Sequence, residues 1–152
     1  MAIVRSAGTE IIRSAYFEDI DNTSAPGQRL IIGEQHHIYT VLSIWIMCAA
    51  VQSEGNQIQV FLRGYDAKAG TTAQDHKIFR WRGVDNDTFV WNDKFSFNGH
   101  EPTDFTGPMD DTTKQNAIAD QGSSVAQFLH CVTTHADDQY EVGITYIDQN
   151  NA

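Results

Sequence analysis

The chain has 152 residues and a mass of 17.0 kDa, which suits one domain of ordinary size. Hydrophobic residues make up 41% and charged residues 20%, a globular composition that argues against a disordered or fibrous chain. With 20 Asp and Glu residues against 10 Lys and Arg, the net charge of −10 disfavours nucleic acids and anionic membranes. No run approaches the about 18 apolar residues of a membrane span. We therefore expect neither nucleic acid nor membrane as a partner.

Hydrophobic and polar residues alternate with a period of two along much of the chain, which is typical of β-strands with one buried face. In chain order, the pattern predicts strands over residues 10–17, 28–32, 38–51, 58–63, 78–82, 88–91, 94–97, 125–134 and 140–147. No long helical periodicity occurs. Many short strands separated by turns favour an all-β fold, a jelly-roll-like antiparallel β-sandwich.

The alternation also predicts which side chains face the core. In 78–82, Phe79 and Trp81 lie opposite Arg80 and Arg82, and in 58–63 the aliphatic residues alternate with Gln, Phe and Arg. The turn residues 53–56 and the pair Asn92-Asp93 each predict a β-hairpin. The acidic pairs Asp110-Asp111 and Asp137-Asp138 are expected to lie in solvated loops.

Two segments depart from the regular pattern. Residues 18–27 read as an extended connection, so we expect an N-terminal arm over 1–28 and a single sandwich domain over 29–152. Residues 98–124 contain two prolines and an acidic pair, and 27 residues is long for a connection, so they predict an inserted loop that carries function or is disordered.

Motifs for catalysis, nucleotide binding and metal binding are absent from the sequence. There is no G-x-S-x-G, no phosphate-binding glycine loop and no zinc-ligand spacing. His130 and Cys131 are adjacent, but neighbours on a strand point to opposite faces, so we expect no Cys-His dyad. The sequence predicts neither an enzyme nor a cofactor, although a calcium ion in the acidic loops stays possible.

Cysteines and aromatic residues leave alternatives open. Cys48 and Cys131 lie in apolar surroundings, which favours two buried thiols over a disulfide. The three tryptophans and five of the phenylalanines either fill the space between two sheets or line a platform for sugars. They are Trp45, Trp81, Trp91, Phe61, Phe79, Phe89, Phe95 and Phe97.

Several strand motifs resemble small β-sandwich virion proteins of tailed bacteriophages. The matching segments are Ile38-Tyr39-Thr40-Val41, Ile44–Ala50, Ile58–Arg63, Asn86–Lys94 and a final strand over Tyr140–Ile147. Leu42-Ser43 replaces the usual proline-containing turn. The N-terminal arm and the 98–124 insertion have no counterpart in the simplest members.

The resemblance implies a non-enzymatic structural protein located on the outer capsid surface of a virion and made in the host cytoplasm. Within the family we expect a decoration (cement) protein, a homotrimer that binds the major capsid protein and bridges capsid subunits. The alternatives are a tail, neck or fibre component, and a carbohydrate- or receptor-binding module.

The arm and the insertion supply the candidate contacts with the capsid, because extended segments gain order by lying on neighbouring subunits. The candidates are Ile3, Val4, Arg5, Ile11, Ile12 and Arg13 in the arm, and Phe105, Pro108 and Met109 in the insertion. The alternative for Ile11, Ile12, Tyr16 and Phe17 is that they belong to the core of a first strand.

Overall fold

The computed structural model describes residues 9–65, 72–101 and 125–150. These residues contain strands and no helix, and therefore no helix long and apolar enough to cross a membrane. The strands are β1 (Thr9–Ile20), β2 (Gln28–Ile32), β3 (His37–Ala50), β4 (Gln57–Tyr65), β5 (Ala73–Arg82), β6 (Thr88–Trp91), β7 (Phe95–Asn98), β8 (His100–Glu101), β9 (Val125–Ala126), β10 (Phe128–Thr133) and β11 (Gln139–Asn150).

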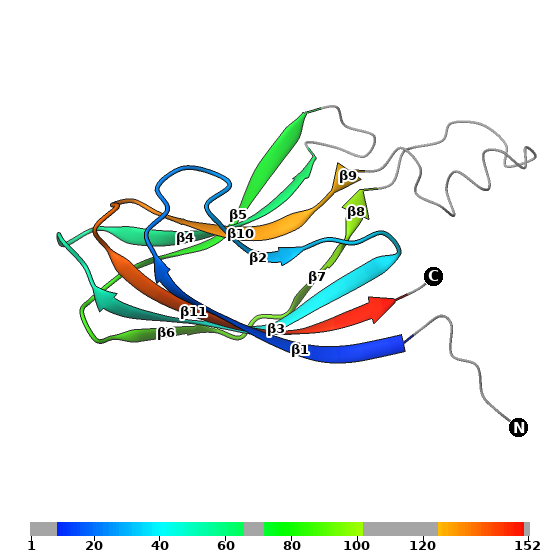
Figure 1. The fold of residues 1–152 in the computed structure, drawn as a ribbon, viewed down its shortest axis with the longest axis horizontal. Coiled ribbons are helices and arrows are strands. Elements are labelled where there is room, and N and C mark those ends of the chain that lie inside the picture. Colours follow the sequence, from blue (N-terminus) through cyan, green and yellow to red (C-terminus); the bar gives the residue numbers. More distant parts are fainter. Residues whose placement is uncertain (1–8, 66–71, 102–124, 151–152) are drawn as a thin grey trace, which may run out of the picture.

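Nine of these strands form two antiparallel sheets that pack face to face (Figure 1). Sheet A has the order β1-β11-β3-β6, and β7 pairs with β3 beside β6. Sheet B has the order β2-β10-β4-β5, and β8 pairs with β9 separately. With β6 and β7 counted as one interrupted strand, these are the two four-stranded sheets of a jelly roll. The predicted all-β sandwich is confirmed.

Both hairpin predictions are wrong. Residues 53–56 connect β3 of sheet A to β4 of sheet B, so they cross between sheets and join no paired strands. Asn92-Asp93 joins β6 and β7, which both run antiparallel to β3 and therefore in the same direction. Turn residues mark where a strand ends, but the partner of a strand depends on which sheet buries its apolar face.

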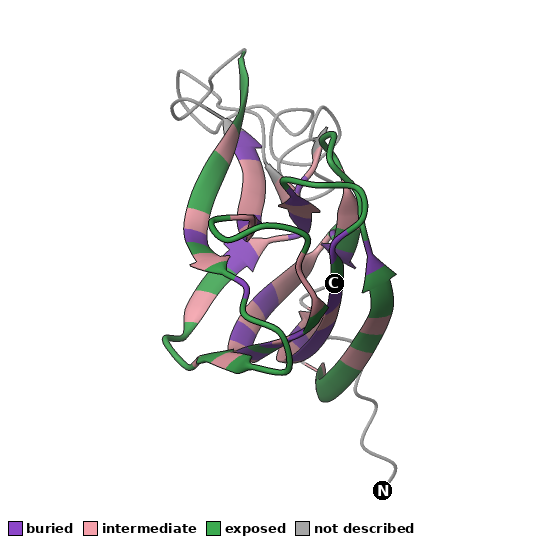
Figure 2. Cartoon of the chain, turned by 90° about the vertical axis from the view of Figure 1, so that its left-hand side faces the viewer, coloured by how far each residue is buried: buried purple, intermediate pink, exposed green. Residues whose placement is uncertain are grey.

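The core lies between the two sheets and consists of inward-facing, mostly aliphatic residues. Figure 2 colours the buried residues of the strands purple. The alternation predicted for 58–63 and 78–82 is confirmed, since Ile58, Val60 and Phe79 are buried. Burying each such side chain stabilises the fold by about 1.5–3 kcal/mol. Other fully buried members are Val41, Ile44, Ile46, Leu129, Val142 and Ile144.

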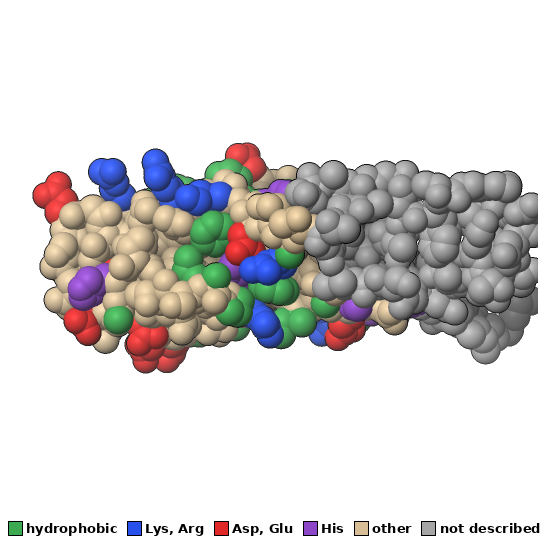
Figure 3. Space-filling view, turned by 90° about the horizontal axis from the view of Figure 1, so that it is seen from above, with side chains coloured by type: hydrophobic (Ala, Val, Ile, Leu, Met, Phe, Trp, Pro, Cys, Tyr) green, Lys and Arg blue, Asp and Glu red, His purple; other side chains and the backbone are tan. Residues whose placement is uncertain are grey.

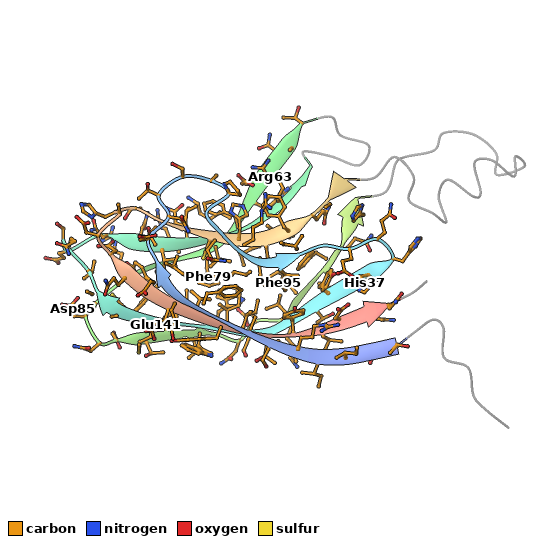
Figure 4. All side chains as sticks on the ribbon, in the orientation of Figure 1. His37, Arg63, Phe79, Asp85, Phe95 and Glu141 are labelled. Carbon is orange, nitrogen blue, oxygen red and sulfur yellow. The ribbon has the colours of Figure 1, made fainter. Side chains whose placement is uncertain are left out.

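Aromatic residues join the sheets at the β5–β6 side. Phe79 of sheet B stacks on Trp91 of sheet A with ring centroids 4.8 Å apart, and Trp81 stacks on Phe89 at 5.9 Å. Phe79 and Phe95 lie between the sheets in Figure 4. These five aromatic residues therefore fill the space between the two sheets, as the first of the two alternatives predicted.

Both cysteines are buried free thiols, Cys48 in β3 and Cys131 in β10. Burial raises the pKa of the Cys48 thiol to about 11 and that of Cys131 to about 12. The expectation of two buried thiols is confirmed, and both stay protonated at neutral pH.

One acidic pair departs from the expected solvated turn. Asp137 is exposed, but Asp138 is buried and its Oδ1 accepts hydrogen bonds from the Gln52 backbone N–H at 2.8 Å and from Asn56 Nδ2 at 3.1 Å. Asp138 therefore ties the β10–β11 turn to the β3–β4 connection.

The segment predicted as an N-terminal arm contains a complete strand. Residues 9–20 form β1, the edge strand of sheet A, in antiparallel pairing with β11 of the same chain. Residues 1–8 lie outside the described residues, as does most of the 98–124 insertion. Within that insertion, residues 98–101 end β7 and form β8.

Candidate binding surfaces

Charged residues are distributed unevenly between the two sheets. The four strands of sheet B contain one acid, Asp75, and five basic residues: Arg29, Arg63, Lys77, Arg80 and Arg82. The strands of sheet A contain one base, Arg13, and five acids: Glu10, Glu18, Asp19, Glu141 and Asp148. A chain with a strong net negative charge therefore has one sheet that is locally basic.

The basic residues of sheet B gather on its outer face, which Figure 3 shows from above together with hydrophobic side chains. Arg80 and Arg82 are exposed and alternate with the inward-facing Phe79 and Trp81. Lys77 lies over the Phe61 ring, with its Nζ 5.8 Å from the ring centroid. We name this surface, with Arg29 and Arg63, the basic face.

Asp75 holds part of the basic face in place. Its carboxylate accepts two hydrogen bonds from the Arg63 guanidinium, Nε to Oδ1 at 2.6 Å and Nη2 to Oδ2 at 3.0 Å. This bidentate geometry fixes the plane of the guanidinium. The Phe128 ring lies beneath two cations, with Arg29 Cζ 4.9 Å and Arg63 Cζ 5.6 Å from its centroid.

His130 lies fully buried under this cluster. Its ring stacks on Phe61 at 5.3 Å and contacts Phe128 at 5.2 Å, and its Nε2 is 3.2 Å from Asp75 Oδ1. Because Nδ1 is buried and has no hydrogen-bond partner among the described residues, we assign the proton to Nε2, which donates to the carboxylate. Cys131 belongs to the core instead, so the expectation that these two neighbours point to opposite faces is confirmed.

The outer face of sheet A carries a row of residues in register across four strands. Tyr16 of β1 pairs with Gly143 of β11, Gly143 with Trp45 of β3, and Trp45 with Val90 of β6. The Tyr16 and Trp45 rings stack with centroids 5.6 Å apart and planes at 29°. Tyr16 is 47% exposed and Trp45 36%. We name the two rings and Gly143 the aromatic platform.

Gly143 makes the platform possible. A Cβ atom on residue 143 would lie 2.0 Å from Cε2 of the Trp45 indole, so the indole occupies the space that a side chain would fill. Since residue 143 faces outward, the ring covers the outer side of β11 and reaches toward Tyr16 of β1. Glycine is thus required here for a close approach, and not for its backbone angles.

Polar groups border the platform. The Glu141 carboxylate lies close to the Tyr16 hydroxyl, and its interaction with the phenol, followed by burial and the charges of Glu141 and Glu18, raises the pKa of Tyr16 to about 12. In the adjacent row, the Ser14 and Thr145 hydroxyl oxygens are 3.4 Å apart. Figure 4 places Glu141 on sheet A and Arg63 on sheet B, on opposite layers of the sandwich.

A polar cleft of about 400 Å³ opens between β1, β2 and β11. Its lining includes Arg13 and the buried Asp148, joined by a 2.8 Å contact from Nε to Oδ2. Asp148 Oδ1 also contacts His37 Nδ1 at 2.6 Å. Among the described residues, no group of three or more His, Cys, Asp or Glu side chains could hold a metal ion.

Three of the nine predicted contact residues fall within the described ranges. Ile11 and Ile12 lie on β1 and are 46% and 69% exposed, so they form part of a strand but not of its core. Arg13 is tied to Asp148 of the same chain. The other six, Ile3, Val4, Arg5, Phe105, Pro108 and Met109, lie outside the described residues.

A comparison with protein-family models finds no match, and a comparison with curated protein sequences finds none either. The resemblance to phage virion proteins therefore stays a prediction.

Sequence reasoning missed the basic face and the role of Gly143. The alternation of Arg80 and Arg82 with Phe79 and Trp81 was a usable signal, because it places both arginines on one outer face. Nothing local to Gly143 or Trp45 indicates their contact, since it depends on the pairing of β11 with β3.

Proposed function

We propose that the chain is a non-enzymatic structural protein of a tailed-phage virion. In this proposal it is a decoration protein, a homotrimer that binds the major capsid protein on the outer surface of the head. The sandwich supplies a rigid body, and the basic face supplies a surface that attracts an acidic protein partner.

The observation that carries the proposal is the separation of charge between the sheets. Five of the ten Lys and Arg residues of the chain lie in the strands of sheet B, with one acid among them. Basic residues concentrated on one face of an acidic protein orient it toward an acidic surface and raise the rate of encounter. Bidentate and ring contacts hold Arg63 and Arg29 in place, which lowers the entropy lost on docking.

The edge strand β1 supports the same proposal. Ile12 is one of the most exposed large hydrophobic residues of the described chain, and no strand of the described residues pairs with the outer edge of β1 in sheet A. Such an edge can accept a strand from a neighbouring subunit. Repeated modest contacts around a trimer would then bridge several capsid subunits.

The test is cosedimentation with undecorated heads of the phage whose genome encodes the chain, together with the solution mass from light scattering. We expect a trimer that binds heads saturably. Replacing both Arg80→Glu and Arg82→Glu should weaken binding by about tenfold or more, because each reversal replaces attraction by repulsion.

Arg80→Glu and Arg82→Glu are also made singly, and Lys94→Glu is the matched control for each of these single reversals. Lys94 is exposed in the β6–β7 turn of sheet A, so the same change of charge occurs away from the basic face. We expect this variant to bind heads like the unaltered protein. A monomer that ignores heads would overturn the proposal, and cosedimentation with purified tails alone would favour the tail alternative.

A further inference from the structure

The aromatic platform is an exposed site that the proposed docking of the basic face does not use. Tyr16, Trp45 and Gly143 lie on the outer face of sheet A, whereas the basic residues lie in sheet B. Soluble proteins bury most Trp and Tyr surface, so two stacked, exposed rings indicate a binding surface. We propose that this platform binds the ring of a neutral sugar.

The shape of the platform suits a pyranose ring. The indole lies over Gly143 and extends the ring surface from β3 across β11 to Tyr16 on β1. Aromatic faces carry a negative quadrupole, which attracts the C–H groups on the apolar face of a sugar. Because Gly143 opens the space for the indole, the platform is formed before any ligand arrives.

The polar border suits sugar hydroxyls. Glu141 and Glu18 lie close enough to the Tyr16 hydroxyl to raise its pKa, so carboxylate oxygens are available at one end of the platform. The Ser14 and Thr145 hydroxyls occupy the adjacent row. Carboxylates accept hydrogen bonds from hydroxyls, and serine and threonine hydroxyls donate or accept them.

The charge of this face selects against anionic ligands. Within the strands of sheet A the one basic residue is Arg13, and its guanidinium contacts Asp148 in the cleft between β1, β2 and β11. Glu10, Glu18 and Glu141 leave the surrounding field negative. The ligand class is therefore a neutral glycan, and not a uronic acid, a sialylated chain or a phosphate.

The experiment is an NMR titration of the full chain with neutral hexasaccharides: cellohexaose, maltohexaose, mannohexaose and chitohexaose. The chain has three tryptophans, and Trp45→Phe assigns the indole N–H signal of Trp45. We expect at least one hexasaccharide to shift this signal, and the backbone amide signals of the platform, saturably. In Trp45→Ala the Kd for that hexasaccharide, followed through the backbone amide signals, should rise by about tenfold or more, since the largest stacking surface is lost.

Matched variants separate the platform from a general loss of structure. Ile32→Ala removes a comparably exposed hydrophobic side chain from β2 in sheet B and should leave the Kd unchanged. Gly143→Ala keeps both rings but displaces the indole, so it should weaken binding as Trp45→Ala does. Urea denaturation confirms that each variant is folded.

Three results would overturn the inference. The first is that none of the four hexasaccharides shifts the Trp45 signal. The second is that tetramethylammonium shifts it while the sugars do not, which would assign the platform to a cation. The third is that Trp45→Ala lowers the solution mass without any sugar effect, which would assign it to self-association. None of these three results tests head binding through the basic face. The sugar proposal can therefore be wrong while the proposed function is right, and the reverse also holds.

Discussion

The two outer faces of the sandwich are built on the same alternation of residues but present opposite chemistry. Sheet B displays arginine and lysine around phenylalanine rings, and sheet A displays tyrosine and tryptophan beside carboxylates. The one acidic residue in the strands of sheet B, Asp75, forms an ion pair with Arg63 of that sheet. The one basic residue in the strands of sheet A, Arg13, forms an ion pair with Asp148. The net charge of the chain therefore does not predict that one of the two sheets is basic.

Of the variants that test this comparison of the two faces, Asp75→Ala should lower the stability of the protein most. Asp75→Ala leaves the Arg63 guanidinium and the buried His130 Nε2 without their acceptor. Unpaired buried donors are costly, so we expect the free energy of unfolding to fall by about 2–4 kcal/mol. Urea denaturation measures it, with Glu10→Ala on exposed β1 as the control at about 0.5 kcal/mol or less. Equal losses in both variants would contradict a structural role for the cluster.

On the opposite face, Gly143→Ala should destabilise the fold less. The added Cβ would lie 2.0 Å from the Trp45 ring, so the indole must move away from β11. Such overpacking typically costs about 1–3 kcal/mol, and here the exposed ring can relax into solvent. We expect a shift in the tryptophan fluorescence spectrum, while Thr145→Ala on the same face leaves it unchanged. An unchanged spectrum in Gly143→Ala would show that the indole does not depend on this glycine.

The basic face should also contribute a smaller, pH-dependent part of the stability. Burial acts to raise the pKa of Asp75, but the hydrogen bonds from Arg63 and His130 and the charge of Arg63 outweigh it and lower the pKa. A carboxyl with a lowered folded pKa stabilises the fold above its unfolded value of about 4 and loses this contribution as pH falls through the folded value. Urea midpoints measured from neutral pH downward should therefore fall more steeply in the unaltered protein than in Asp75→Asn. Parallel curves would refute the assignment.

The smallest expected effect concerns the phenol of the aromatic platform. The interaction with the Glu141 carboxylate is the largest cause that raises the pKa of Tyr16 to about 12. Glu141→Gln removes the charge, so the pKa of Tyr16 should move down toward the ordinary value of about 10. Ultraviolet titration of tyrosinate measures the change, and Tyr16→Phe identifies the signal. The idea fails if Glu141→Gln leaves the titration curve where it was.

The sequence was sufficient to predict local structure because alternation is a local property. The bounds of β2 and β6 coincide with the predicted strands 28–32 and 88–91, and the inward residues of β4 and β5 are the predicted ones. The predicted strand over 125–134 corresponds to two strands, β9 and β10, which are separated at Gln127. The backbone N–H of Gln127 donates a hydrogen bond to the Gly99 carbonyl.

Strand pairing and the binding surfaces could not be predicted in the same way. The hairpin expected at 53–56 requires β3 and β4 to share a sheet, and burial of their apolar faces places them in different sheets. The platform joins Tyr16, Trp45 and Gly143 from distant parts of the chain. The sequence alone does not show whether Trp45 faces the core or the outer surface, because the residues on both sides of it are apolar. The strand register decides this.

The position of β11 between β1 and β3 has a consequence for how the protein folds. The first strand of sheet A to leave the ribosome pairs with the last, and until β11 emerges β1 and β3 have no common partner. Most consecutive strands also alternate between the sheets, so few contacts form early between neighbours in sequence. Proteins whose contacts are mostly between distant parts of the sequence fold slowly, and their partly folded states expose unpaired strand edges. Sheet A is therefore completed only after synthesis has passed residue 150, and chaperones that shield unpaired edges would have most effect before that moment.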